Sequence, residues 1–354
     1  GKMAKLKIGI VGAGNIANAH LAAYRNVDDA EIAAICDINK VRLNETADLF
    51  GIEKRYLSED EMIAKENLDA ADICVYNRDH AKCTVTALQS GLHVLCEKPM
   101  AYSSKEAQEM KDAAERNNKL LMIGFVLRFS DNACIARDFI NSGTLGEIYH
   151  TKATYLRRHG APGGWFCNRA ISGGGPVIDL GVHVIDLTRY MMGSPKPVSV
   201  YAVTQNKLAN RANLKTDVAW KPRDAKDDDI YDVEDFGTAI ISYDNGATTL
   251  LETSYSLNGE EKTSQEFFGT KGGIKLDESG FKIYGEMNDY MVDIIPKTDN
   301  LKGGGDAFVS EMRHFVNCAA GREKCIATAD DGIEVMKILE AIYESARTGH
   351  EVIL

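Results

Sequence analysis

A glycine-rich turn near the start of the chain restricts its fold more than any other feature. The turn reads GAGNIA over residues 12–17, follows the continuous apolar run Leu6–Val11 and precedes a helical pattern over residues 15–25. In such a turn the first glycine permits the tight bend and the second lets a pyrophosphate approach the backbone. A small residue at position 17 lets the helix pack closely on the strand. This order of strand, turn and helix predicts the first unit of a dinucleotide-binding domain.

An acidic residue lies where the second strand of such a domain ends. Asp37 directly follows the apolar run at residues 31–36 and lies 20 residues past Ala17. A carboxylate in this place accepts hydrogen bonds from the hydroxyls of a ribose. Ile38 and Asn39 follow it, so no adjacent cation would neutralise a 2′-phosphate. The sequence therefore predicts NAD as the cofactor and disfavours NADP.

The first 127 residues alternate apolar runs with amphipathic stretches. The runs are β-branched and continuous rather than alternating, which is typical of strands buried on both faces. Strands that alternate with helices of this length indicate a parallel sheet with right-handed crossovers. Besides the elements above, we expect strands at residues 71–76, 93–96 and 120–125, and helices at residues 40–50, 81–90 and 104–117.

After about residue 128 the pattern changes to an α+β arrangement. A chain of 354 residues exceeds the roughly 250–300 residues at which single cores tend to split. The predicted fold class is therefore α/β, with an N-terminal Rossmann domain (residues 1–127) and a C-terminal α+β domain (residues 128–354) that has a large, mostly antiparallel, open-faced sheet. In this second domain we expect helices at residues 132–142, 179–192, 307–320 and 329–348, and strands at residues 148–157, 198–205, 236–243, 247–255, 265–269 and 281–284.

The composition excludes several classes of partner. The chain has 41 Lys and Arg residues against 52 Asp and Glu residues, which gives a net charge of −11, and it contains no cluster of basic residues. This charge argues against nucleic acid or an anionic membrane as the main partner. No apolar run approaches the roughly 18 residues of a membrane helix, and no signal peptide pattern opens the chain, so we expect a cytoplasmic protein. The eight cysteines include no C-x-x-C pair. We expect them to be free, and we expect no metal site.

Two further motifs carry reactive side chains. Glu97-Lys98-Pro99 follows a predicted parallel strand, and ligands of such sheets gather at the carboxyl ends of the strands. A lysine there can stabilise a substrate hydroxyl as its alkoxide. The alternative without a catalytic role is a surface Glu–Lys pair beside a turn proline. This alternative would be preferred without the dinucleotide-binding context.

The second motif is a glycine-rich approach to a helix with an acid and a histidine. Three glycines at residues 173–175 precede Asp179 and His183, which are four residues apart and so share a helix face. That face can direct both side chains at one ligand, and Asp186 could orient the imidazole. We expect the glycines to give the helix a flexible approach. The alternative is a core histidine beside an acid at the helix N-terminus.

Together these motifs resemble the Gfo/Idh/MocA family of sugar and cyclitol oxidoreductases over nearly the whole chain. Further signs are Asn77 with His80, the GLHV run at residues 91–94 and the Arg128-Phe129 pair. The chain departs from the family at Val75-Tyr76, where Thr-Pro usually precedes the asparagine, and the Arg78-Asp79 pair that follows is more charged than usual. The resemblance implies that Lys98, Asp179 and His183 are catalytic. It also implies, together with the residue reading above, that the cofactor is bound by Gly12, Gly14, Asn15, Ile16, Asp37, Asn77, His80, Glu97, Lys98 and Arg128.

The resemblance also implies a reaction. An NAD(P)-dependent dehydrogenase would transfer a hydride between nicotinamide C4 and a hydroxyl-bearing carbon of a sugar, glycoside or inositol. His183 would act as general base, Lys98 would stabilise the alkoxide, and Asp179 would fix a neighbouring hydroxyl. Arg157 and Trp165, beside a loop that lines the substrate pocket in such proteins, would contact the substrate, although a surface loop with a packing tryptophan is an equal alternative. Similar proteins associate through the open sheet, so we expect a homodimer or homotetramer.

Two other functions fit the same residues. One is an NAD-dependent glycoside hydrolase of the same family, in which the sugar is oxidised transiently, elimination breaks the glycosidic bond and the hydride returns. The other is a non-enzymatic sensor of sugar or NAD. The intact Glu97-Lys98-Pro99 motif and His183 argue against a sensor. Net turnover of NAD would separate a dehydrogenase from the hydrolase.

Overall fold

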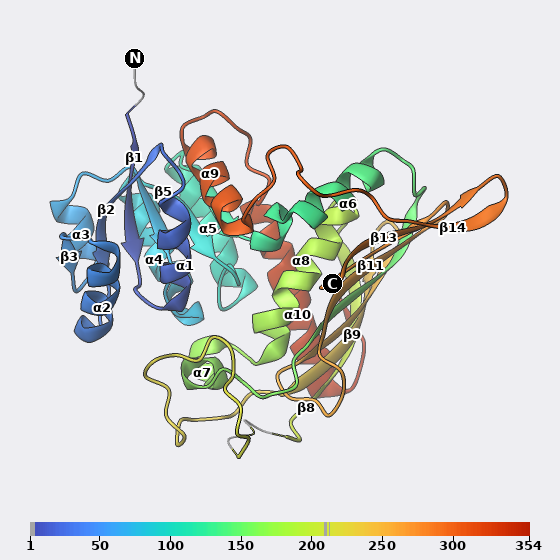
Figure 1. The fold of residues 1–354 in the computed structure, drawn as a ribbon. Coiled ribbons are helices and arrows are strands. Elements are labelled where there is room, and N and C mark those ends of the chain that lie inside the picture. The colour runs from blue at the N-terminus through green and yellow to red at the C-terminus, as the bar shows by residue number, and fades with distance from the viewer. Residues whose placement is uncertain (1–3, 209–210, 212) are drawn as a thin grey trace. The chain divides into compact units, whose positions relative to one another are not determined.

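The computed structural model describes residues 4–208, 211 and 213–354, and this described chain divides into two compact units (Figure 1). The first unit runs to Val126 and also includes Asp306–Met336, and the second comprises Leu127–Gly305 with Lys337–Leu354. The sequence had predicted a single division after residue 127. That division has to be corrected for residues 306–336, which join the first unit although they follow the second in the chain.

The first unit is built around a parallel sheet. Over the described residues the sheet has six strands in the order β3-β2-β1-β4-β5-β6. Strands β4 and β6 are buried along their whole length, as the continuous apolar runs had predicted. Its elements are β1 (Leu6–Val11), α1 (Asn15–Tyr24), β2 (Ala30–Cys36), α2 (Lys40–Phe50), β3 (Arg55–Tyr56), α3 (Glu59–Lys65), β4 (Ala70–Ile73), η1 (Asn77–Asp79), α4 (His80–Gln89), β5 (His93–Glu97), α5 (Ser104–Arg116) and β6 (Leu121–Gly124).

Two elements of this unit were not predicted. Strand β3 is only two residues long, too short for a periodic pattern. Helix α3 follows it at once, with Ser58 as its N-cap. Strand β3 pairs with β2 at the edge of the sheet, and α3 packs against β1, β2 and β3. The additions leave the order of the predicted strands unchanged.

The late segment joins the first unit through an apolar helix face and backbone hydrogen bonds. Helix α9 (Ala307–Ala319) packs against α1 and buries Met312, Phe315 and Val316. Farther along, the N–H of Ile123 in β6 donates to the carbonyl of Ala327 at 3.0 Å. Such long-range contacts leave no local signal, so sequence periodicity predicted the helix but not the unit to which it belongs.

The second unit contains a mixed, mostly antiparallel sheet. Its nine strands, counted within the described ranges, have the order β14-β13-β12-β11-β7-β10-β9-β8-β15, and only the β7–β10 pair among them is parallel. The predicted fold class is thus confirmed, although strands β12, β14 and β15 were not predicted. The strands are β7 (Ile148–Leu156), β8 (Pro197–Gln205), β9 (Phe236–Tyr243), β10 (Thr248–Ser254), β11 (Lys262–Gly269), β12 (Gly273–Asp277), β13 (Gly280–Met287), β14 (Tyr290–Ile294) and β15 (Val352–Ile353).

Helices cover one face of this sheet. Helix α6 packs on β12, helix α8 packs on β7, β10 and β11, and the last part of α10 reaches β8, where Ser345 Oγ accepts the N–H of Ala202 at 2.8 Å. The core between these layers includes Leu187, Phe267 and Ile274. The helical segments are η2 (Val126–Phe129), α6 (Asp131–Asn141), η3 (Gly164–Cys167), α7 (Arg169–Ser172), η4 (Val177–Gly181), α8 (Val182–Met191) and α10 (Ala329–Thr348), which begins in the first unit.

The other face of the sheet exposes apolar side chains. Strand residues alternate between the two faces, so Val200 and Ile241 are buried while their neighbours Tyr201 and Ile240 are 46% and 52% exposed. Tyr201 and Ile240 are partners across strands β8 and β9. Within the described ranges, no helix has the length and apolar character needed to cross a membrane.

We predict that a second copy of the chain covers this outer face, because a contiguous apolar surface is unfavourable in water. Light scattering at micromolar concentration should give a mass of at least two chains. Tyr201→Lys combined with Ile240→Glu should shift that mass towards 38.8 kDa. Leu49→Lys, which changes an exposed apolar residue of α2, is the matched control and should not alter the mass. A monomeric wild-type protein would contradict the prediction.

Candidate functional site

The glycine turn of the first unit forms a cradle for a phosphate group. Gly12 has φ +105°, and a Cβ on it would lie 2.2 Å from the carbonyl oxygen of Cys74. Gly14 is the N-cap of α1, and a Cβ on it would meet none of the described atoms within 4 Å. Asn15 and Ile16 open the helix, whose first turn holds no acidic residue. The space beside Gly14 lies at the N-terminus of α1, where backbone N–H groups attract anions, so the turn fits a dinucleotide pyrophosphate.

Asp37 is held rigidly at the carboxyl end of β2. One carboxylate oxygen accepts the N–H of Ala13 at 2.9 Å, and the other accepts the N–H of Asn39 at 2.7 Å. These bonds tie the acid to the glycine turn. The bonds fix the carboxylate at the strand end, where an acid could accept hydrogen bonds from the hydroxyls of a ribose.

A cation that the sequence reasoning missed lies on this carboxylate. Arg42 donates to both oxygens of Asp37, from Nε at 3.1 Å and from Nη2 at 3.0 Å, and its guanidinium lies 5.7 Å from the ring centre of Tyr76. Burial opposes the charge of Arg42, but the hydrogen bonds to Asp37 and Tyr76 raise its pKa above the ordinary value. The argument against NADP had assumed that no cation stood beside the acid. Arg42 is five residues after Asp37 in sequence. Because it lies in the first turn of α2, its side chain reaches the carboxyl end of β2, where Asp37 lies.

The turn that carries Lys98 is braced by a buried histidine. His80 Nδ1 lies 2.6 Å from the carbonyl oxygen of Pro99, and Nε2 lies 3.0 Å from that of Val75. Burial lowers the pKa of His80, although both carbonyls favour the protonated ring. Lys98 itself is half-buried, and the predicted cofactor residue Asn77 is buried in η1. The geometry supports a role for His80 in holding the loop after β4 against the lysine turn.

Behind this turn lies a buried charge network centred on His20, a residue to which the sequence assigned no partner. His20 Nδ1 lies 2.7 Å from Asp72, and Nε2 lies 2.7 Å from Glu97. Burial opposes protonation of His20, but Asp72 and its hydrogen bond outweigh this and raise the pKa well above the ordinary value. The imidazolium therefore donates to both carboxylates. Glu97 in turn accepts the backbone N–H of Lys98 at 3.1 Å, so the network sets the lysine's backbone.

A third buried acid joins this network from α9. Glu311 is fully buried, and neither of its carboxyl oxygens has a hydrogen-bond partner in the described part of the chain. Burial, followed by repulsion from Glu97, raises the pKa of Glu311 well above its ordinary value. Glu311 therefore remains protonated where an exposed glutamate is ionised. It comes from the late segment of the chain, so no local pattern could place it beside His20.

In the second unit, Asp179 and His183 lie on consecutive helical segments. Asp179 lies in η4, a π-helical turn, and His183 lies in the first turn of α8. Tyr255 donates from its hydroxyl to Asp179 Oδ2 at 2.7 Å and is completely buried. Sequence reasoning missed Tyr255, which directly follows β10. π-Helical turns of this kind frequently lie at functional sites.

Aromatic and basic side chains of β7 and the residues after it extend this group. The rings of His183 and Tyr155 are 6.4 Å apart, and the guanidinium of Arg157 lies 5.4 Å from the ring centre of Tyr155. Burial opposes the charge of Arg157, but Tyr155 and Asp179 raise its pKa. The second unit thus gathers an acid, a histidine, an arginine and two tyrosines. Trp165 stacks on Phe166 at 4.1 Å between ring centres, which is the packing role of the alternative interpretation.

The glycines before η4 serve close packing, not flexibility as we had expected. A Cβ on Gly174 would lie 2.1 Å from the hydroxyl of Tyr343, and one on Gly175 would lie 2.3 Å from the carbonyl oxygen of Glu234. The buried Glu234 carboxylate also accepts the N–H of Gly175 at 3.0 Å and that of Val177 at 3.2 Å. Tyr343 donates to the same carboxylate at 2.6 Å. These contacts pin the backbone that leads into Asp179.

Asp186 and Arg128 form a buried ion pair with each other. Their two hydrogen bonds measure 2.9 and 2.6 Å, and the guanidinium lies 4.1 Å from the ring centre of Tyr190. Asp186 was expected to orient His183, and Arg128 was expected to border the cofactor. The pairing gives Asp186 a partner that spacing along the helix did not predict, and it supports a structural role for Arg128, whose side chain is fully buried.

Comparison with known proteins covers nearly the whole chain. The family model described as an oxidoreductase family with an NAD-binding Rossmann fold matches residues 6–125, and a GFO/IDH/MocA C-terminal domain model matches residues 135–275. The chain is 34% identical to D-glucoside 3-dehydrogenase of Escherichia coli (strain K12) over 351 residues, which cover 98% of this chain and 97% of the relative. It is 26% identical to levoglucosan dehydrogenase of Pseudarthrobacter phenanthrenivorans, with 97% of each chain covered.

Solved structures resemble the chain over the same length. Levoglucosan dehydrogenase in complex with NADH and levoglucosan matches with a TM-score of 0.84 at 25% identity, covering 99% of each chain. Aldose-aldose oxidoreductase from Caulobacter crescentus, complexed with glycerol, matches with a TM-score of 0.82 at 25% identity and covers 99% of this chain and 100% of that one. These matches extend across both units.

We predict that Arg42 determines how well a 2′-phosphate is tolerated. The wild-type protein should bind NAD at least tenfold more tightly than NADP, about 1.4 kcal/mol. Asp37→Ala should release Arg42 and narrow or invert this gap, because the guanidinium can then pair with the phosphate. Calorimetric titration of both nucleotides measures the ratio. Adding Arg42→Ala to Asp37→Ala should remove the gain in NADP affinity. The prediction would be contradicted if the double variant bound NADP as tightly as Asp37→Ala alone.

The buried network predicts that stability falls as pH rises. Glu311 and His20 both have folded pKa values above those of the unfolded chain, so their stabilisation is fully present below the unfolded pKa values, about 4.3 and 6.5. It is lost as pH rises towards the folded values. The melting temperature of Glu311→Gln should therefore decrease less between pH 5 and pH 8 than that of wild type. At pH 8 the variant should melt about 2 °C or more above wild type.

Thermal unfolding followed by circular dichroism measures this effect. Glu344→Gln is the matched control, since Glu344 is a surface acid whose pKa is lowered by its hydrogen bond to Arg347. Its stability should follow the wild-type pH dependence over this range. Equal pH dependence in wild type and Glu311→Gln would show that the buried carboxyl is not protonated in the folded chain.

Proposed function

This chain belongs to the Gfo/Idh/MocA family of NAD-binding oxidoreductases, and from that premise we propose that it transfers a hydride between nicotinamide C4 and a secondary hydroxyl-bearing carbon of a sugar or glycoside. The observation that carries the proposal is the second unit's group of Asp179, His183 and Arg157, supported by two tyrosines. An acid, an imidazole and a guanidinium held together suit a ligand with several adjacent hydroxyls.

A pyranoside is the substrate class that we favour. The relative at 34% identity, which matches over 98% of this chain, is named D-glucoside 3-dehydrogenase. The levoglucosan dehydrogenase structure was solved in complex with NADH and levoglucosan. The name of the first relative points to oxidation at C3 of a glucoside. We therefore propose a glycoside oxidised at a ring carbon such as C3, with a free sugar or an inositol as the alternatives.

The first unit would hold the cofactor, which supplies a hydride acceptor or donor at C4 of its nicotinamide. Gly12, Gly14 and the first N–H groups of α1 would bind the pyrophosphate. Asp37 would bind the ribose hydroxyls. Arg42 and two backbone N–H groups already occupy both oxygens of Asp37, so the guanidinium would have to shift when the ribose enters. The remaining proposed cofactor residues are Asn15, Ile16, Asn77, His80, Glu97, Lys98 and Arg128.

The reacting hydroxyl would be handled by two side chains. During oxidation His183 would take its proton as general base, a task suited to an imidazole near neutral pH. Lys98 would stabilise the negative charge that develops on the oxygen. His80 and the His20 network would hold the lysine turn in place. These residues do not touch the substrate in this proposal, so they act as positioning residues.

Asp179 would hold a neighbouring hydroxyl and thereby select the carbon that reacts. The hydrogen bond from Tyr255 to Oδ2 restrains rotation of the carboxylate. Glu234 and the tightly packed glycines restrain the backbone at η4. Arg157 would bind further hydroxyls, and Trp165 would line the same loop. A fixed carboxylate reduces the entropy lost when the sugar binds.

The hydrolase alternative uses the same residues but regenerates NAD in each cycle. We do not favour it, because D-glucoside 3-dehydrogenase and levoglucosan dehydrogenase are both named for net oxidation. A panel of glycosides, free sugars and inositols with NAD and NADP, followed by NADH absorbance and product analysis, tests the proposal. Net NADH and a keto product support the dehydrogenase. Glycoside cleavage without net NADH would support the hydrolase, and no reaction with any member would favour the sensor.

We predict different kinetic effects for the three proposed catalytic residues. Lys98→Met and His183→Phe should each lower kcat by about 10²–10⁴-fold, because both act on charge that develops only in the transition state. NAD affinity measured by calorimetry should change little. Asp179→Asn should raise KM at least as much as it lowers kcat, and Tyr255→Phe should have a smaller effect of the same kind.

The pH profile of oxidation assigns the base. If His183 is the base, the acid limb of the wild-type profile should disappear in His183→Phe. Persistence of that limb in His183→Phe together with its loss in Lys98→Met would assign the base to Lys98. Wild-type rates in both variants would overturn the dehydrogenase mechanism.

A further inference from the structure

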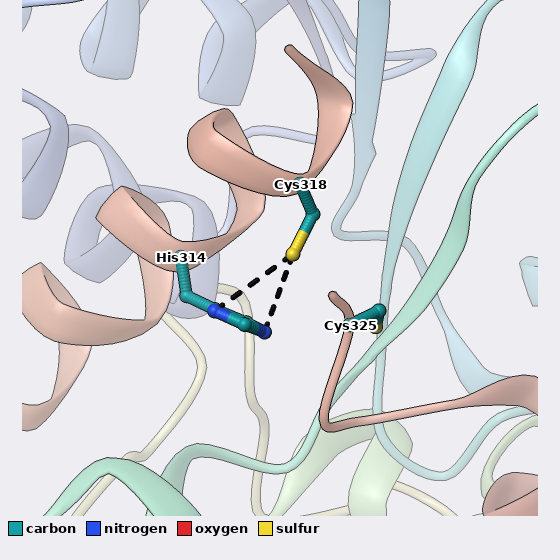
Figure 2. A group of neighbouring side chains, drawn as sticks. All are labelled: His314, Cys318 and Cys325. Atoms are coloured by element: carbon teal, nitrogen blue, oxygen red, sulfur yellow. Dashed lines mark hydrogen bonds between the residues drawn. The ribbon is translucent and has the colours of Figure 1, made fainter. Parts of the chain in front are cut away.

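A histidine and two cysteines of the first unit lie together at the end of α9 (Figure 2). His314 and Cys318 are four residues apart and so project from the same face of the helix. Cys325 follows in the loop after it. The possible ligand atoms of these three side chains all lie within 4.8 Å of one another. The absence of a C-x-x-C pair had led us to expect unconnected cysteines and no metal site.

Hydrogen bonds around His314 define its tautomer. The backbone N–H of Ile326 donates to Nε2 at 3.1 Å, so Nε2 carries the lone pair. Nδ1 then carries the proton and donates it to Glu323 at 2.6 Å. Asn317 supports the same carboxylate with a hydrogen bond of 2.8 Å. A carboxylate on the far nitrogen is the arrangement that orients metal-ligating histidines and raises their basicity.

The spacing of sulfur and nitrogen fits a tetrahedral ion. Cys318 Sγ lies 3.3 Å from His314 Nε2 (Figure 2). Bonds of about 2.3 Å to sulfur and about 2.0–2.1 Å to nitrogen would separate such ligand atoms by roughly 3.6 Å at a tetrahedral centre. Binding would require small side-chain shifts and the exchange of existing hydrogen bonds for metal bonds. These include the bond from the Ile326 N–H to Nε2, the contact between Cys318 and Nε2, and the 3.4 Å hydrogen bond from Cys325 to the carbonyl of Ala327.

The chemistry of the donor set selects the ion. Two thiolates and an imidazole are soft or borderline ligands that suit zinc and disfavour magnesium and calcium. Cys318 and Cys325 are half-buried, and the side chain of Glu323 is 45% exposed. The cluster is therefore partly accessible to solvent, from which an ion and a water ligand could enter.

We propose that His314, Cys318 and Cys325 form a zinc-binding site, with Glu323 as its supporting carboxylate and water as the fourth ligand. The ion would fasten the loop at residues 320–328 to α9. That loop reaches the nucleotide-binding sheet, since Ile123 in β6 donates to Ala327 and Met122 forms a bridge with Thr328. The site would thus stabilise the edge of the sheet, apart from the catalytic chemistry.

Cobalt is the probe for this site. The full-length protein, reduced and stripped of metal, is titrated with Co²⁺. One ion per chain should bind and produce a thiolate-to-cobalt charge-transfer band together with the strong visible bands of tetrahedral cobalt, and Zn²⁺ should displace it. Cys318→Ser and Cys325→Ser should each weaken binding at least tenfold, and Glu323→Gln about 10–100-fold. Cys134→Ser, which changes an exposed cysteine outside the cluster, should have no effect.

A second measurement uses the wild-type protein and therefore does not depend on folding of the variants. Zinc should slow alkylation of Cys318 and Cys325 by iodoacetamide, as read by peptide mass spectrometry, and should leave Cys134 unprotected. Excess zinc should also raise the melting temperature of wild type. No tetrahedral cobalt spectrum, or alkylation of Cys318 and Cys325 that zinc does not slow, would overturn the proposal.

Discussion

The first unit depends on the buried contacts that the His20 imidazolium makes with two carboxylates. These contacts join helix α1, which opens at the glycine turn, to Asp72 of β4 and Glu97 of β5. Buried ion pairs of this kind add little net stability over apolar packing. Removing one partner is costly, since about 3–5 kcal/mol is lost when a buried charge stays uncompensated. The network therefore specifies geometry: the helix for the pyrophosphate and the turn that carries Lys98 are fastened to one another.

The second unit also fixes the geometry of its candidate site residues, but it does so with different buried side chains. Glu234, bonded to Tyr343 and to backbone N–H groups, fixes the chain before η4. Tyr255 then fixes the carboxylate of Asp179. In each unit, buried and hydrogen-bonded side chains thus surround the residues that we propose as reactive. Such preorganisation is what a reaction needs when charge develops on one oxygen, because the protein does not have to rearrange in the transition state.

Sequence reasoning about the site succeeded where the signal was local and failed where the partner was distant. The glycine turn, Asp37 at a strand end and the spacing of Asp179 and His183 are properties of short segments, and the structure has each in the expected element. Arg42 returns to Asp37 only because α2 begins where it does. Asp186 pairs with Arg128, which lies 58 residues away in the chain. Spacing along a helix gives the face of a residue, but it does not predict a partner from a distant segment.

The sequence alone determined the fold class, because strand and helix periodicities and glycine turns arise from local backbone geometry and from burial on one or both faces. It also determined the family, through motifs whose residues are close in sequence. Only the tertiary structure decided that residues 306–336 join the first unit, that Glu311 meets His20, and that His314, Cys318 and Cys325 form one cluster. These contacts depend on packing between segments far apart in the chain, and packing leaves no periodic trace in either segment.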